Sequence, residues 1–135
     1  MKIFLDANVI FTAAHNPSGK AAFLLRLKVP ERWKLVTCVL AMEEAERNLP
    51  IKFPKGVGEL KKIVGRMGLV ATVVEGECPI ELPPKDTPIF LSARQAGCSH
   101  LLTGDLKDFG RFMNQPKKSG GILIQTVNDF LTALR

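Results

Sequence analysis

Cysteine and histidine are scarce in this sequence, with three and two copies among 135 residues. Cys38, Cys78 and Cys98 are an odd number, lie far apart and form no C-x-x-C pair. A disulfide framework needs paired cysteines, and a Cys/His zinc site needs closely spaced ligands, so the sequence supports neither. A reducing compartment fits this cysteine content.

Long apolar runs are also lacking. No stretch approaches the roughly 20 consecutive apolar residues of a bilayer-spanning helix, and residues 2–14 lack the basic start and cleavage pattern of a signal peptide. We therefore expect a cytoplasmic protein that does not contact membranes. The 46% hydrophobic content suffices for one well-packed core in a chain of 135 residues. This predicts a single domain over residues 1–135, and we find no internal repeat.

The net charge is +6, and Lys and Arg are concentrated in residues 51–68 and 106–121. Such an excess favours binding to a polyanion, because cations that neutralise phosphates release counterions. It is equally compatible with a simple role in solubility. Charge alone therefore leaves the partner open.

Apolar strand-like runs alternate with helix-like segments along the chain. Asp86 has the features of a helix N-cap, with Pro88 in the first turn and Gly97 after the last, while Pro50 is expected to stop an earlier helix. This alternation predicts a three-layer α/β/α sandwich with a roughly five-stranded parallel sheet. The expected strands are 2–6, 34–39, 69–74, 99–105 and 121–127, and the expected helices are 19–28, 40–49, 59–68, 86–97 and 128–135, with a proline-rich connection over 75–84.

Acidic residues fall where these strands end. Asp6 follows the first strand, Asp105 follows the run HLLTG, and Asp86 precedes the helix that leads into that run. A glutamate of MEEAERN comes early in the helix after the second strand. In a parallel sheet, strand carboxyl ends and helix amino ends share one edge, so these carboxylates are expected to meet.

Carboxylates gathered at one place raise one another's pKa unless a cation neutralises them. Oxygen ligands without Cys or His favour a hard ion, Mg²⁺ or Mn²⁺. A metal beside a phosphodiester polarises the phosphoryl oxygen and lowers the pKa of bound water. The pattern therefore predicts metal-dependent phosphodiester hydrolysis, with the basic excess holding a polyanionic substrate.

Several of these assignments have structural alternatives. Asp6 could simply cap or brace a turn, and an N-cap role would explain Asp86 fully. Helical periodicity in MEEAERN places Glu46 closer to the apolar side than Glu44, and so mildly favours Glu46.

Three stretches together resemble the PIN-domain nucleases, which include the VapC-like toxin ribonucleases of toxin–antitoxin modules. The resemblance covers nearly the whole chain and implies a PIN-like fold. The stretches are FLDANVIF, VTCVLAMEEAERNL and KDTPIFLSARQAGCSHLLTGDLKDF.

The resemblance implies a Mg²⁺- or Mn²⁺-dependent endoribonuclease that uses a metal-activated water and leaves a 5′-phosphate and a 3′-hydroxyl. It also implies an antitoxin partner and a homodimer. The acidic residues that it assigns as catalytic and metal-binding are Asp6, Glu44, Asp86 and Asp105, with Asp108 as an additional metal ligand.

Other polar residues have weaker assignments. Asn8 could orient Asp6 or form a turn, and Thr103 could hydrogen-bond to the site or pack within a strand. Arg94 and Arg111 are candidates for phosphate binding, although exposed helix arginines are often only solvated.

Two rival functions remain. A haloacid-dehalogenase-like phosphatase would need a second Asp where Asn8 stands, which disfavours that class. A metal-containing RNA-binding module that does not cleave, or cleaves only with a partner, would carry the same ligands, and the sequence does not exclude it.

Overall fold

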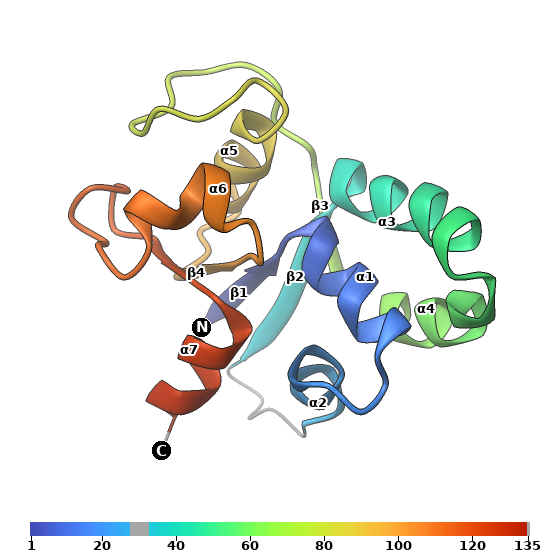
Figure 1. Ribbon diagram of the computed structural model, residues 1–135. Coiled ribbons are helices and arrows are strands. Elements are labelled where there is room, and N and C mark those ends of the chain that lie inside the picture. The colour runs from blue at the N-terminus through green and yellow to red at the C-terminus, as the bar shows by residue number, and fades with distance from the viewer. Residues whose placement is uncertain (28–32, 135) are drawn as a thin grey trace.

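Within residues 1–27 and 33–134, which the computed structural model describes, five parallel strands form one sheet in the order β3-β2-β1-β4-β5 (Figure 1). β1 lies at the centre, where Ile3 pairs with Leu35 of β2 and with His100 of β4. Helices cover both faces, so the predicted three-layer α/β/α architecture is confirmed. The strands are β1 (Lys2–Leu5), β2 (Lys34–Cys38), β3 (Gly68–Val70), β4 (His100–Leu102) and β5 (Leu123–Gln125).

Two apolar clusters fix the helices to the sheet. Successive strand residues point to opposite faces, so Ile3 and Leu5 join one cluster and Phe4 joins the other. The first cluster also holds buried side chains of α1, α2, α3, α4 and α7, and the second those of α5 and α6. The helices are α1 (Ala7–His15), α2 (Lys20–Arg26), α3 (Val39–Lys52), α4 (Val57–Val64), α5 (Thr87–Gln95), α6 (Leu106–Phe109) and α7 (Val127–Ala133), with 3₁₀ turns η1 (Pro54–Gly56) and η2 (Gly110–Phe112).

Helix α1 was not expected from the sequence. Its residues Ala7, Val9, Ile10, Ala13 and Ala14 are all buried. They recur at the three- and four-residue spacing of a helix, and Thr12 and His15 lie exposed on the other side. The helix was missed because it is short and only Asp6 separates it from β1.

The prediction that Pro50 stops a helix is wrong, because α3 continues to Lys52. Pro50 lies in the last turn, where it removes the one N–H that would donate to the Glu46 carbonyl. Glu46 is exposed, so its carbonyl can bond to water, and the Phe53 N–H still donates to the Leu49 carbonyl at 2.7 Å. The helix expected over 59–68 is likewise displaced, since α4 begins at Val57 and ends before Gly65.

The strand predicted over 69–74 ends at Val70. Beyond it, the Thr72 hydroxyl accepts from the Leu40 N–H, and the Val73 N–H donates to the Ser92 hydroxyl at 2.8 Å. These bonds tie the chain to α3 and α5 and end its pairing with β2.

The remaining boundaries shift by a few residues. The helix predicted over 19–28 is observed as α2, and residue 28 lies outside the described residues. The last helix begins at Val127, with Thr126 as its N-cap. The connection over 75–84 contains neither helix nor strand, as predicted. In the described part of the chain, no helix has both the length and the apolarity needed to cross a bilayer.

Candidate active site

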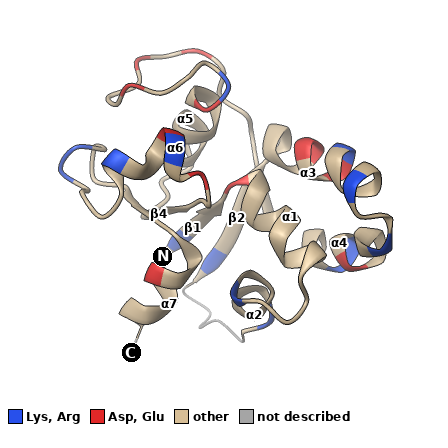
Figure 2. Cartoon of the chain, viewed as in Figure 1, with Lys and Arg blue, Asp and Glu red and all other residues tan. Residues whose placement is uncertain are grey.

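A cavity of about 480 Å³ opens at the edge where the strands end and the helices begin. Acidic residues occur where α1, α5 and α6 begin and along α3 (Figure 2). The topology therefore brings together carboxylates that are far apart in the sequence. The predicted site residues that line the cavity are Asp6, Asn8, Glu44, Asp86 and Asp105.

Asp6 is buried between β1 and α1, where both of its carboxylate oxygens accept hydrogen bonds. Its Oδ1 accepts from the Ala7 N–H at 2.7 Å, and its Oδ2 accepts from the Thr103 hydroxyl at 2.8 Å and from Asn8 Nδ2 at 3.1 Å. Burial raises the pKa of Asp6, the nearby Glu44 charge raises it further, and these three hydrogen bonds oppose the rise. Asp6 thus caps α1 and also faces the cavity.

Thr103 and Asn8 link the first turn of α1 to the chain after β4. The fully buried Thr103 hydroxyl accepts from Asn8 Nδ2 at 3.2 Å and from the Asp105 N–H at 3.1 Å. Asn8 Oδ1 accepts from the Gly104 N–H at 2.7 Å. These bonds determine where the Asp6 and Asp105 carboxylates stand relative to each other.

Asp86, Asp105 and Asp108 form a second group. One carboxylate oxygen from each lies within 4.8 Å of the others. Asp105 caps α6, because its Oδ1 accepts from the Asp108 N–H at 3.0 Å. Asp108 belongs to this group, although it is absent from the lining of the carboxylate cavity and lies beside a smaller depression with Arg111.

Asp86 occupies the N-cap position of α5, but its side chain makes no capping hydrogen bond. Its Oδ2 is buried and has no hydrogen-bond partner among the described residues. The pKa of Asp86 is raised to about 7, mainly by burial and in addition by the neighbouring Asp108 and Asp105 carboxylates. The alternative that an N-cap role fully explains Asp86 is therefore not supported by its hydrogen bonds.

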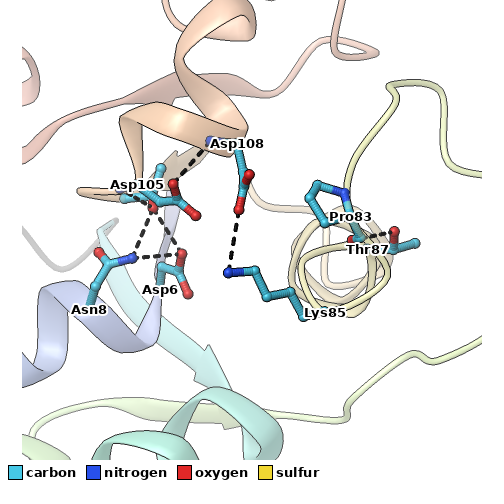
Figure 3. Close-up of polar contacts among 8 residues, drawn as sticks. Asp6, Asn8, Pro83, Lys85, Thr87, Asp105 and Asp108 are labelled. Atoms are coloured by element: carbon cyan, nitrogen blue, oxygen red, sulfur yellow. Dashed lines mark hydrogen bonds and ion pairs between the residues drawn. The ribbon is translucent and has the colours of Figure 1, made fainter.

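Asp108 has the opposite shift from Asp86. Its contact with the Asp86 carboxyl, which takes the proton that the two share, lowers the pKa of Asp108, and the charge of Lys85 acts in the same direction. The Lys85 ammonium lies 3.5 Å from Asp108 Oδ2 (Figure 3). The three carboxylates thus have one nearby lysine to offset their charge, and Lys85 also lines the cavity.

On α3, Glu44 is the glutamate whose side chain lines the cavity, together with Asn48 and Lys52, one and two turns further on. Glu46 is exposed and does not line it. The mild preference of periodicity for Glu46 is therefore not supported by the placement. The buried Ala45 lines the cavity next to Glu44.

The two arginines proposed for phosphate binding lie away from the cavity. Arg94 is exposed in the last turn of α5, at the opposite end from Asp86. Arg111 donates to the Glu81 carbonyl at 3.2 Å and pairs with the Glu81 carboxylate at 3.5 Å. Neither arginine lines the carboxylate cavity, although Arg111 lies beside Asp108 at the smaller depression.

Five further polar and aromatic residues line the cavity and were not singled out from the sequence. On α3, a Glu-x₃-Asn-x₃-Lys spacing places three polar side chains on one helical face, which is a signal that could have been found. Lys85 directly precedes Asp86 in a loop, and no periodic pattern marks it. These residues are Phe11, Thr12, Asn48, Lys52 and Lys85.

The donor set fits a hard divalent cation. The cavity offers carboxylate oxygens from several elements, and the Asp86 oxygen without a partner lies among them. No cysteine or histidine lines it, so the ligand chemistry favours Mg²⁺ or Mn²⁺ over zinc.

No protein-family model matches the sequence, and a comparison with curated proteins finds no match. Solved structures do match. VapBC2 from Rickettsia felis, bound to a DNA fragment from their promoter, aligns over 93% of this chain and 98% of its own, with a TM-score of 0.67 and 13% identity. VapBC-1 from nontypeable Haemophilus influenzae aligns over 95% and 99%, with a TM-score of 0.61 and 15% identity.

A third structure, Mycobacterium tuberculosis VapC20, is described as a sarcin–ricin loop cleaving toxin. It aligns over 76% of this chain and 91% of its own, with a TM-score of 0.53 and 17% identity. At such low identity these matches show a shared fold of the backbone and nothing more specific. The chain therefore has the fold of the VapC-type toxins, which is the PIN-like fold that its motifs resemble.

Proposed function

We propose that the chain is a metal-dependent endoribonuclease, built as one nuclease domain over residues 1–135, that hydrolyses RNA at the carboxylate cavity. The observation that carries this proposal is the buried Asp86 Oδ2, which has no hydrogen-bond partner and stands in a group with Asp105 and Asp108. Leaving a buried carboxylate oxygen unpaired costs about 1–3 kcal/mol. A divalent cation would remove that cost.

Asp6, Glu44, Asp86 and Asp105 would hold Mg²⁺ or Mn²⁺, with Asp108 alongside. When bound, such an ion lowers the pKa of a coordinated water and polarises the scissile phosphoryl group. Asn8 and Thr103 keep the Asp6 carboxylate in place, and their hydrogen bonds favour its ionised form. Lys85 offers a positive charge at the cavity wall for a phosphate of the substrate.

RNA is favoured as the substrate by two considerations. The net charge of +6 gives a polyanion an electrostatic advantage at a cavity whose own carboxylates would repel it. The fold is shared with a toxin described as cleaving the sarcin–ricin loop.

The decisive experiment incubates the purified chain with a mixed RNA pool in Mn²⁺ and in EDTA, and compares Asp6→Asn and Glu44→Gln with Glu46→Gln. We expect cleavage by the wild type in Mn²⁺ alone, a loss of at least about 100-fold in the first two variants and little change in Glu46→Gln. Product ends are read by 5′-phosphate-dependent exonuclease digestion.

Wild-type protein that binds Mn²⁺ and RNA but never cleaves would favour the RNA-binding module. Failure to bind metal at all would refute the acidic-site proposal.

We also propose a toxin role, with an antitoxin partner and self-association, because the fold matches structures described as VapBC complexes. Induced expression of the wild type is then expected to arrest growth, whereas Asp105→Asn is expected to be tolerated at the same protein level. Equal toxicity of the two chains would contradict the role, and light scattering of the purified chain reports the oligomer.

A further inference from the structure

Part of the cavity wall is formed by residues other than the carboxylates. Phe11 and Thr12 of α1 and Asn48 and Lys52 of α3 line it, and we call these four residues the α1–α3 wall. Phe11 is partly buried against the core, whereas Thr12 and Lys52 are exposed. The wall combines an aromatic ring, an amide and a cation, none of which the proposed hydrolysis uses.

The ring of Phe11 is the first of an aromatic row that leads away from the carboxylates. His15 is stacked with Phe11 at 5.9 Å between ring centroids and 18° between planes. The rings of His15 and Phe53 meet edge to face, with 4.4 Å between their centroids. The row is held from both sides, by α1 and by the segment after α3, so its rings keep their orientation without a ligand.

Lys52 completes the wall with a positive charge. Its ammonium lies 6.0 Å from the centroid of the Phe11 ring. The lysine is exposed at the end of α3, and its flexible side chain can turn from the ring to a phosphate without disturbing the core. Proteins bind single-stranded nucleic acids by combining aromatic rings, on which bases stack, with cations that pair with the phosphates.

We propose that Phe11 and Lys52 form a nucleotide subsite for single-stranded RNA, with a base stacked on Phe11 and its phosphate paired with Lys52. This rests on the proposed nuclease function, because it takes the strand to continue from the cleavage centre. Phe11 stands five residues after Asp6, about 7.5 Å further along the axis of α1. The subsite therefore holds a nucleotide next to the cleaved bond and not the one at the carboxylates.

The subsite predicts a preference for unpaired strands. A base in a duplex is stacked on its neighbours and cannot lay its face on a protein ring. Asn48 adds an amide that can donate to and accept from a base edge.

The test measures binding of a fluorescein-labelled eight-nucleotide single-stranded RNA by anisotropy, in an Asp105→Asn background that keeps the RNA intact. Phe11→Leu retains apolar bulk against the core but removes the aromatic face, and Phe11→Tyr retains both. We expect Phe11→Leu to weaken binding by at least about fivefold and Phe11→Tyr to leave it within about twofold. Lys52→Met is expected to weaken binding more than Lys55→Met, since Lys55 lies outside the cavity lining.

Abasic nucleotides, placed at each position in turn, show whether Phe11 contacts a base. With Phe11 present, one abasic position should lower the affinity about fivefold, and in Phe11→Leu the same position should have no further effect. Equal losses in both proteins, or unchanged binding by Phe11→Leu, would overturn the subsite.

Cleavage by the chain with Asp105 intact, measured in parallel in Mn²⁺, separates the two proposals. Cleavage together with binding that ignores Phe11 refutes the subsite and keeps the nuclease. Phe11-dependent binding without cleavage refutes the nuclease and keeps the subsite.

Discussion

For Asp86, the capping role expected from its position in the sequence differs clearly from the surroundings of its side chain in the folded structure. Position alone makes it the N-cap of α5, yet its side chain makes no hydrogen bond to the backbone of that helix, and the Thr87 N–H donates instead to the Pro83 carbonyl at 3.1 Å. One of its oxygens is instead buried without a partner beside Asp105 and Asp108. Among the described residues this oxygen has no partner to offset its burial, which destabilises the metal-free fold and is expected of the proposed metal ligand.

Asp86→Asn is therefore expected to stabilise the metal-free chain near pH 8, by about 1–2 kcal/mol in the free energy of unfolding, since an uncharged amide is cheaper to bury. Urea unfolding in EDTA measures the change. Glu75→Gln, the same carboxylate-to-amide change at an exposed residue outside the cavity lining, is the matched control and should change little. A less stable Asp86→Asn protein would show that the carboxylate supports the fold.

The raised pKa of Asp86 also gives the metal-free chain a pH dependence. The folded state holds a proton up to about pH 7, whereas the unfolded state releases it near the ordinary value of 3.8. Stability is then greatest below pH 4 as far as Asp86 is concerned, and falls as the pH rises from about 4 to 7. Melting in EDTA across this range measures the slope, which Asp86→Asn should reduce.

At the scale of elements, α1 and the chain after β4 form one unit through Thr103. Its hydroxyl donates to Asp6 and accepts from Asn8 and from the Asp105 N–H. Valine has a similar β-branched shape and would pack equally well at the end of this strand. The three hydrogen bonds are therefore what the threonine hydroxyl adds.

Thr103→Val keeps the shape and removes the three bonds. We expect the free energy of unfolding to fall by about 1–3 kcal/mol, because buried donors and acceptors lose their partner. Metal affinity should also fall, since Asp6 and Asp105 are no longer held relative to each other. Thr103→Ser, which retains the hydroxyl, should recover most of the affinity, and isothermal titration with Mn²⁺ measures it. Equal Mn²⁺ affinities for the Val and Ser variants would contradict the positioning role.

At the scale of the whole molecule, metal binding is expected to raise the free energy of unfolding and the Tm. A ligand that binds only the folded state at 100 times its Kd adds about 2.7 kcal/mol. We expect Mg²⁺ or Mn²⁺ to raise the Tm of the wild type and of Glu46→Gln, and to leave that of Asp105→Asn nearly unchanged. An equal rise in Asp105→Asn would place the bound ion elsewhere.

The alternation of strands and helices and the parallel sheet followed from sequence pattern, because apolar runs and turn residues act locally. Asp6 and Asp105 could be assigned to one edge for the same reason, since parallel topology puts all strand carboxyl ends there. Helix α1 was missed because it is short and only Asp6 separates it from β1. The Pro50 prediction failed because the proline removes one backbone hydrogen bond while the next turn still closes through the Phe53 N–H and the Leu49 carbonyl.

The sequence by itself determined the sheet and the identity of the acidic residues near its edge. Only the tertiary structure decided that Glu44 faces the cavity and Glu46 does not, that Asp86 leaves its cap bond unmade, and that Lys85 and Phe11 join the site. The physical reason is that side-chain direction and burial depend on the packing of α1, α3, α5 and α6 against one another across the sheet edge, and no local pattern carries that information.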